Sequence, residues 1–308
     1  MSLRPLTPAL AEKARVELNE KPSSLKADLQ LLKDWIAKQP HLRARTDDQW
    51  LVSFLRGCKF SLEKTKEKLD LYYTVRTTLP ELYNIKHSDP IFEELYSLGS
   101  MLLLPKTSGP DSPRVTLIRP GRFDANKFNV LQMLAVSNVL QKIVLMEDDQ
   151  AVVAGTIIIL DLHGVSLAHF FQMTPVTIKK LVVSAQDASP IRMKGIHCLN
   201  TPPGFETIYN AMKSLLNEKN QNRLYVHNTN YDELYKYVTK DILPVEYGGN
   251  AGTTDSIIDH WKSKVTEYSS FLEEDQNYGT DESRRIKTKT VENSTLGIEG
   301  SFRQLEVD

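Results

Sequence analysis

The sequence predicts an α/β protein in which a small N-terminal helical bundle precedes a mostly parallel β-sheet flanked by helices. Apolar residues recur at helical spacing before residue 80, short apolar strands alternate with helices from about residue 100, and the run 155–162 has no polar alternation. A strand that is apolar on both faces belongs in the centre of a sheet covered on both sides. We expect three parts: helical residues 1–95, an α/β domain over 96–250, and a C-terminal helix with a polar tail over 251–308.

The N-terminal part is predicted to contain three helices, over residues 25–39, 46–57 and 61–79. Each shows apolar residues at helical spacing and ends at or before a proline or glycine. Thr46 and Gln49 have the spacing of a capping box, in which Thr46 accepts from the Gln49 amide and the Gln49 side chain reaches back. Short turns between these helices favour a small bundle.

From about residue 100, short apolar runs predict strands, and longer segments between them predict helices. Asn126 is expected to cap a helix that reaches about Met146, and Pro175 opens another. A last helix is expected near residues 257–265, followed by a polar, mobile segment over 273–295 and a more apolar ending that can dock back. The predicted strands are Met101–Leu104, Val115–Ile118, 155–162, Ile196–Leu199 and Leu224–Val226.

Composition excludes several classes of protein. The 308 residues carry 38 Lys+Arg against 39 Asp+Glu, whereas general nucleic-acid binders carry a basic excess. The 2 cysteines, Cys58 and Cys198, lie in apolar runs and are expected to be buried free thiols. No run approaches ~18 apolar residues, and the N-terminus lacks a signal-like stretch. These features predict a cytoplasmic protein, which we expect to be a monomer without a nucleic-acid partner.

Motifs for catalysis are missing from the sequence. It contains neither a Gly-x-Ser-x-Gly elbow nor a P-loop, and the Gly-rich segment 248–252 fits a domain-ending turn. Asp161, His163 and His169 lie at and after the end of the central strand, where α/β proteins often hold ligands. Because a third metal ligand with suitable spacing is missing, we interpret the Asp–His pair as structural and expect no metal and no enzymatic activity.

The segment 203–217 is predicted to be a strongly amphipathic helix. It either packs on the sheet as ordinary core or acts as a movable lid over an apolar cavity, and periodicity does not distinguish these alternatives. The helix 131–146, the strand 156–160 and residues 173–191 would form the other walls of such a cavity. The residues of the lid stripe are Phe205, Ile208, Tyr209, Met212 and Leu216.

Two pairs of basic residues bracket the strand–helix unit 196–216. Arg192 and Lys194 are two residues apart, so an extended segment points both the same way. Lys219 and Arg223 are four residues apart, as on one face of a helix. All four can converge on one surface and bind a phosphorylated headgroup through charge-assisted contacts. The alternative is that both pairs belong to ordinary solvated faces.

Four stretches resemble the CRAL-TRIO family of lipid-binding proteins, in the family's order. Residues 54–60, FLRGCKF, resemble the FLRARKF signature of its N-terminal helical segment, and residues 159–164, ILDLHG, resemble its central strand. Residues 192–200 and 243–249 resemble two further family stretches. The similarity covers about residues 25–249 and is greatest to the tocopherol- and retinaldehyde-binding members. The ending EGSFRQL resembles the tails of invertebrate members.

The resemblance implies a cavity for one lipid, closed by the helix 203–217 as a mobile lid. The four basic residues match, position by position, the cleft with which tocopherol-binding members bind phosphatidylinositol bisphosphate. Thr156, Ser184 and Ala185 stand where those members have larger apolar side chains, so tocopherol itself is not carried over, and the cleft departs from the phospholipid-exchanging members. The residues expected to line the cavity are Leu134, Ser137, Asn138, Gln141, Thr156, Ile158, Leu160, Met173, Leu181, Ser184, Ala185 and Ile191.

The function expected from these observations is intracellular binding and transfer of a small hydrophobic lipid of the vitamin E, retinoid or other isoprenoid type. The lipid would be cargo, and no cofactor is expected. Headgroup contact would place the protein peripherally on endosomal or other phosphoinositide-bearing membranes, where Leu167, Phe170 and Phe171 could touch the bilayer. The alternative is a lipid-sensing adaptor that transfers nothing between membranes.

Overall fold

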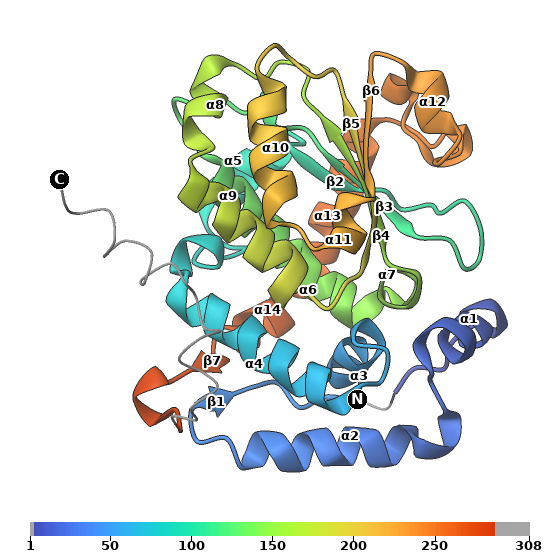
Figure 1. Cartoon of the computed structure of the whole chain (residues 1–308), viewed down its shortest axis with the longest axis vertical. Coiled ribbons are helices and arrows are strands. Elements are labelled where there is room, and N and C mark those ends of the chain that lie inside the picture. Colours follow the sequence, from blue (N-terminus) through green and yellow to red (C-terminus); the bar gives the residue numbers. More distant parts are fainter. Residues whose placement is uncertain (1–2, 287–308) are drawn as a thin grey trace.

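A five-stranded, mostly parallel sheet forms the centre of the α/β lobe (Figure 1). The computed structural model describes residues 3–286. The strand order is β2-β3-β4-β5-β6, with the first pair antiparallel and the others parallel. The central position of β4 follows from its apolar run, and the predicted α/β class is confirmed. The strands are β2 (Met101–Leu103), β3 (Arg114–Ile118), β4 (Thr156–Asp161), β5 (Met193–Leu199) and β6 (Leu224–Asn228).

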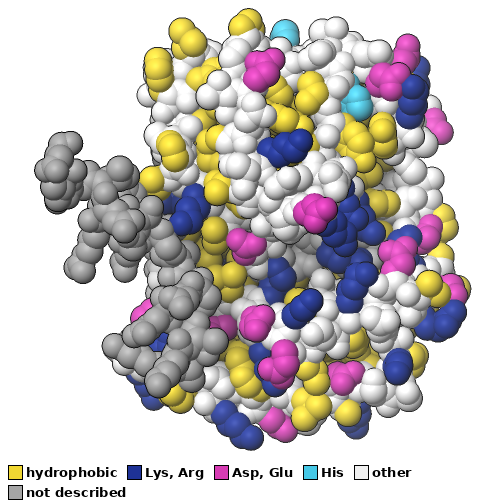
Figure 2. Space-filling model, viewed as in Figure 1, with side chains coloured by type: hydrophobic (Ala, Val, Ile, Leu, Met, Phe, Trp, Pro, Cys, Tyr) yellow, Lys and Arg dark blue, Asp and Glu magenta, His cyan; other side chains and the backbone are white. Residues whose placement is uncertain are grey.

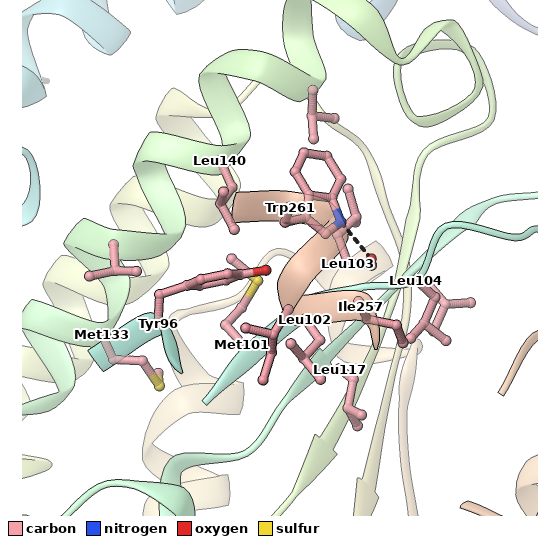
Figure 3. Packing of buried hydrophobic residues seen from close by; sticks show 14 of the residues in the cluster. Tyr96, Met101, Leu102, Leu103, Leu104, Leu117, Met133, Leu140, Ile257 and Trp261 are labelled. Atoms are coloured by element: carbon pink, nitrogen blue, oxygen red, sulfur yellow. Dashed lines mark hydrogen bonds between the residues drawn. The ribbon is translucent and has the colours of Figure 1, made fainter. Parts of the chain in front are cut away.

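The long helix α6 (Val130–Glu147) and the C-terminal helix α13 (Thr254–Glu267) pack against one face of the sheet in the main hydrophobic core. Figure 3 shows Trp261 of α13 beside Leu140 of α6, with its indole nitrogen donating to the Leu103 carbonyl at 2.9 Å. The length and composition of α6 would suit a membrane span, but most of its residues are buried in this core. It is therefore a core helix.

The N-cap of α6 is Asn129, not Asn126 as predicted. Asn129 accepts from the Gln132 amide at 3.0 Å, and the Gln132 side chain accepts from the Asn129 amide at 2.9 Å, which is a capping box. Asn126 instead donates through its backbone and side chain to Asp124, in the turn before the helix. Both asparagines can cap a helix, but only one has a glutamine three residues later.

Helices α8 to α10 lie together on the other side of the sheet (Figure 1). A π-helical turn, η3 (Val183–Ala188), continues α9 and leads towards β5. π-Helical turns are rare and often occur at functional sites. The helices of this lobe are α7 (Asp149–Ala154), α8 (Leu167–Gln172), α9 (Pro175–Val182), α10 (Phe205–Leu215), α11 (Glu218–Gln221) and α12 (Tyr231–Tyr235).

Residues 90–97 form an unpredicted helix that packs on α6 in the main core. The N-terminal lobe itself contains the three predicted helices and one further unpredicted helix at its beginning. Its core is aromatic, with Trp50, Phe54 and Tyr72 in mutual ring contact. The predicted Thr46–Gln49 capping box is wrong, because Gln49 donates to the Asp149 carboxylate at 3.1 Å. The helices are α1 (Pro8–Leu18), α2 (Pro22–Ala37), α3 (Asp48–Gly57), α4 (Leu62–Thr78) and α5 (Pro90–Ser97).

The chain beyond α13 returns to the N-terminal lobe. Helix α14 (Ser269–Asp275) ends in a buried aspartate, and β7 (Gly279–Thr280) pairs antiparallel with β1 (Leu42–Arg43). The prediction of a mobile segment from residue 273 is therefore wrong as far as residue 286. The rest of that segment and the predicted docking of residues 296–305 lie outside the described residues.

Candidate functional site

The two faces of the central strand β4 are packed differently. Ile159, which faces the core formed with α6, is 0% exposed, whereas its neighbours Ile158 and Leu160 are only half-buried. Ile158 and Leu160 join a smaller cluster with Cys198 on β5 and Phe205 on α10. The middle strand of a covered sheet is expected to be buried on both faces. The side facing α10 is therefore less completely buried than expected, and this is the side where the sequence predicts the cavity.

Helix α10 is held at its two ends. Phe205 at its start and Leu216 after its end are buried, whereas Ile208, Tyr209 and Met212 between them are half-buried. Gly204 precedes the helix in the left-handed region with φ 85°, and it has no neighbouring atom within 4 Å of where a Cβ would lie. The amphipathic segment thus forms the predicted helix and lays its apolar stripe towards the sheet.

The C-terminal end of α10 is tied to the π-helical turn. The side-chain oxygen of Gln186 accepts from the Asn217 amide at 3.0 Å and from the Asn220 side chain at 2.9 Å. The turn is itself tied to the N-terminal lobe, because the Lys68 ammonium of α4 donates to the carbonyls of Gln186, Asp187 and Ser189 at 2.5–3.1 Å. Burial lowers the pKa of Lys68 below its ordinary value.

Most polar residues predicted to line the cavity already have partners within the protein. Asn138 of α6 is buried and donates to the Leu82 carbonyl at 2.8 Å, and Gln141 donates to the Ser189 hydroxyl at 3.2 Å. The Ser137 hydroxyl donates back to its own helix, at the Met133 carbonyl. These hydrogen bonds to protein groups therefore fix the positions of the three side chains.

The other predicted wall residues are distributed over α6, β4, α9 and the turn that follows. Thr156 donates through its hydroxyl to the Arg114 carbonyl at 3.0 Å, and the Ser184 hydroxyl lies 3.4 Å from that of Tyr83. Ala185 is exposed. The half-buried wall residues are Leu134, Met173, Leu181 and Ile191.

The Asp161–His163–His169 group does not form a catalytic arrangement. The Asp161 carboxylate accepts from the Tyr247 hydroxyl at 2.5 Å, from the Asn200 side chain at 2.8 Å and from the His163 amide at 3.0 Å. His169 instead bonds Ser166 at the start of α8. Asp161 thus joins the ends of two strands to the loop of Tyr247, and burial together with Asp161 raises the pKa of Tyr247.

The described residues contain neither a candidate metal site nor a thiol that is ionised near neutral pH. Within residues 3–286, no cluster of three or more His, Cys, Asp or Glu side chains could hold a metal ion. Both cysteines are free and buried, as predicted. Burial raises the pKa of Cys58 and raises that of Cys198 to about 12, so both thiols remain protonated near neutral pH.

The structure brings the four predicted basic residues together at the start of β5 and before β6. The Arg192 guanidinium donates to the Val153 carbonyl, and that of Arg223 donates to the Met193 carbonyl. Partial burial and then the charges of Arg223, Lys59 and Arg192 lower the pKa of Lys219. Figure 2 shows Lys and Arg side chains gathered on this face, over the place of α11 in Figure 1. We call Arg192, Lys194, Lys219 and Arg223 the basic cluster.

Two charged residues near the basic cluster were missed by sequence reasoning. Lys59 follows α3 in the left-handed region with φ 53°. The loop that carries it is fixed by Gly57, where a Cβ would lie 2.2 Å from the Pro190 carbonyl oxygen. Glu17 of α1 lies 3.4 Å from the Lys194 ammonium and 3.1 Å from that of Lys13. The glycine at position 57 indicated a close turn after α3 that would carry Lys59, but no local sequence pattern marks Glu17.

Comparisons with known proteins agree with the fold described above. The sequence model of the CRAL/TRIO domain matches residues 101–249, and that of the Pinta-like UBA domain matches residues 21–91. The human protein named alpha-tocopherol transfer protein-like is 35% identical over 253 residues, which cover 82% of this chain and 73% of that protein. Clavesin-1 of Xenopus laevis is 29% identical over 246 residues, covering 79% and 74%. The crystal structure of Sfh5 aligns with a TM-score of 0.50 at 16% identity, over 83% of this chain and 92% of that one, and supports the fold.

Proposed function

Since this chain belongs to the CRAL/TRIO family of lipid-binding and transfer proteins, as its four sequence stretches predicted, we propose that it is a monomeric intracellular carrier of one small apolar lipid. The observation that carries the proposal is the contrast between the two faces of β4. Ile159 is sealed in the core and Ile157 on the same face is half-buried against that core, whereas both Ile158 and Leu160, under α10, are only half-buried. Partly exposed apolar side chains on the helix-covered face of a sheet favour an apolar partner such as a lipid.

The walls favour a compact apolar cargo of the tocopherol, retinoid or other isoprenoid type. Burying ~300–400 Å² of apolar ligand surface at ~25 cal/mol/Å² contributes about 7–10 kcal/mol before the costs of association. Asn138 and Gln141 are held by protein partners, so they offer few free polar groups to a cargo headgroup. A non-phospholipid cargo fits this lining better than a phospholipid.

We propose that the protein docks on a membrane through exposed apolar side chains of α8 and through the basic cluster, which belong to the same lobe. Leu167 and Phe171 of α8 are 74% and 80% exposed, and Phe170 is half-buried beside them. Insertion of one such side chain into a bilayer is worth up to ~1.5–3 kcal/mol. The basic cluster would hold a phosphoinositide headgroup by charge-assisted hydrogen bonds. Because Lys219 lies just beyond the end of α10, headgroup contact there would favour opening of the lid and release of cargo.

The headgroup site is tested with liposomes that contain phosphatidylinositol bisphosphate. Lys219→Ala with Arg223→Ala should weaken binding to these liposomes at least ~10-fold and leave cargo affinity unchanged. Lys236→Ala with Lys240→Ala removes the same charge from the exposed segment after α12 and is the matched control. Equal binding by the cluster variant and the control would overturn the headgroup site.

Transfer is distinguished from lipid sensing by moving a fluorescent lipid between donor and acceptor vesicles. A carrier should accelerate this transfer well above the spontaneous rate, and the cluster variant should slow it. An adaptor should bind the same lipid without accelerating its movement.

A third possibility, lipid hydrolysis, predicts turnover that depends on Asp161 and His163. Because Asp161 already accepts three hydrogen bonds from protein, we expect no such turnover.

A further inference from the structure

A pocket separate from the lid and the basic cluster lies between the two lobes. It has a volume of about 230 Å³ and is bordered by α4, the loop after it, α6 and the residues around the end of α14. Pockets for drug-sized ligands are usually ~300–1,000 Å³, so this one suits a smaller molecule. The side chains that give it its chemical character are Arg76, Tyr83, Lys86, His87, Lys142 and Tyr278.

Two cations in the wall of this pocket share one carboxylate. Asp275 lies 2.8 Å from the Arg76 guanidinium and 2.9 Å from the Lys142 ammonium, both at its Oδ2. The side chains of Arg76 and Lys142 are 7% and 9% exposed, and that of Asp275 is 0% exposed. These three groups therefore carry a net charge of +1 in a nearly dry environment.

The surroundings of the three groups strengthen their attraction for an anion. Lys86 lies exposed in the pocket's border and adds a positive charge at its mouth. A cleft lined by one sign of charge with low-dielectric walls concentrates the electrostatic field. Arg76 carries a planar donor group of the kind that suits the oxygens of phosphates and carboxylates, and its two terminal nitrogens already donate to the carboxylate and the carbonyl of Asp275. Burial lowers the pKa of Lys142 most strongly, the charge of Asp275 opposes this and that of Arg76 adds to it, and an anion beside Lys142 would favour its charged form.

We propose that the pocket between α4, α6 and α14 binds a small oxyanion of the phosphate class, either the free ion or a phosphomonoester. This site does not depend on the lipid-carrier function, because it shares no residue with the basic cluster or the lid. The anion would neutralise the excess charge of Arg76 and Lys142 and join the two lobes more firmly. The competing explanation is that both cations serve only to hold Asp275.

The test measures the Tm of the full-length protein in sodium phosphate, in glycerol 3-phosphate and in sodium chloride at equal ionic strength. Lys142→Met removes the excess charge and leaves the Arg76–Asp275 pair balanced, so this variant is expected to fold. Lys142→Arg keeps the charge. Lys264→Met removes an ion-paired lysine of α13 outside the pocket, where Lys264 lies 2.7 Å from Glu147, and serves as the control.

Each ligand is added at about tenfold its Kd, and the Tm is compared with that in chloride. The Tm of the wild type, Lys142→Arg and Lys264→Met should rise by about 2–4 °C. The Tm of Lys142→Met should rise by less than about 0.5 °C. A larger rise with phosphate assigns the free ion, and a larger rise with glycerol 3-phosphate assigns the monoester. An equal rise in Lys142→Met, or no rise in the wild type, would overturn the proposal. So would loss of the rise in the Lys219→Ala, Arg223→Ala variant, because the anion would then bind the basic cluster. Isothermal titration with the same two ligands should give one site per chain in the wild type and none in Lys142→Met.

Discussion

Replacing Asp275 with Asn should destabilise the protein strongly, because this carboxylate holds three segments that are distant in the sequence. It contacts Arg76 of α4 and Lys142 of α6 from the end of α14. Asparagine keeps the shape of the side chain and removes its charge, which leaves two nearly buried cations without a counter-ion. Breaking a buried ion pair in this way costs about 3–5 kcal/mol. For a protein of this size, with an unfolding entropy of about 2.1 cal/mol/K per residue, the loss corresponds to a Tm lower by about 5–8 °C.

Urea unfolding at pH 7, followed by circular dichroism, measures this loss. Asp111→Asn is the matched control, because Asp111 is 46% exposed and pairs with Lys13 at 3.1 Å, and its loss should change the free energy of unfolding by less than about 1 kcal/mol. Adding Lys142→Met to Asp275→Asn removes one of the two stranded cations and should restore part of the lost stability. A loss below about 1 kcal/mol in Asp275→Asn, or no recovery on adding Lys142→Met, would refute the reasoning.

The same carboxylate makes stability depend on pH in a definite direction. Burial alone would raise the pKa of Asp275, but the charges of Lys142 and Arg76 outweigh it and hold the pKa below its ordinary value of 3.8. A depressed carboxylate pKa stabilises the fold above the unfolded pKa. We therefore expect this contribution to be complete at neutral pH and to be lost as the pH falls below about 4. Asp275→Asn should lack this acid-dependent loss.

Three further predictions follow from local geometry. Lys59 has left-handed backbone with φ 53°, so Lys59→Gly should raise the free energy of unfolding by about 0.5–1 kcal/mol. The same change removes a positive charge and should weaken binding to phosphoinositide liposomes. Unchanged liposome binding would exclude Lys59 from the headgroup site. Glu17→Gln removes the carboxylate 3.4 Å from Lys194 and should strengthen liposome binding by about 2–5-fold in co-sedimentation, and weaker binding would contradict a competing role. Burial and then the neighbouring His227 lower the pKa of His197 from 6.5 to about 4. Because the unfolded chain binds this proton more readily, the free energy of unfolding should fall by about 2 kcal/mol between pH 7 and pH 5 through this group. Urea unfolding of His197→Phe should show a pH dependence smaller by that amount, and a pH dependence equal to that of the wild type would contradict the lowered pKa.

The arrangement of the sheet could be predicted because its signals are local. The apolar run of β4 identified the central strand, and the alternation of strands with helices identified the parallel sheet. The capping of α6 was also locally encoded, although the prediction named only Asn126 and overlooked Asn129 with its glutamine three residues later. The Thr46–Gln49 box failed for a different reason. There a long-range partner, Asp149, binds Gln49 in place of the local backbone.

The candidate site could be predicted only where its residues lie within one strand–helix unit. The spacings of Arg192 with Lys194 and of Lys219 with Arg223 indicated one surface, and the charges of Arg192 and Arg223 do reach both lysines. The predicted helical face shared by Lys219 and Arg223 is wrong, because α11 ends at Gln221 and Arg223 lies beyond it. Glu17 reaches the same surface through the packing of α1 on α7, which is a long-range contact with no local signature. The buried Asp275 lay in a stretch predicted to be mobile, because charged residues surround it and its two cationic partners come from other helices.

The central claim is that a single apolar molecule occupies the space between α10 and the half-buried face of β4. Native mass spectrometry of the full-length protein purified from its own tissue, followed by organic extraction, tests this claim most directly. The account predicts one co-purified apolar molecule at about one per chain, of the isoprenoid size class, and its displacement by retinoids or tocopherols of similar shape. A protein that is empty as purified, and that takes up none of the retinoids, tocopherols, sterols or phospholipids offered to it, would contradict the account.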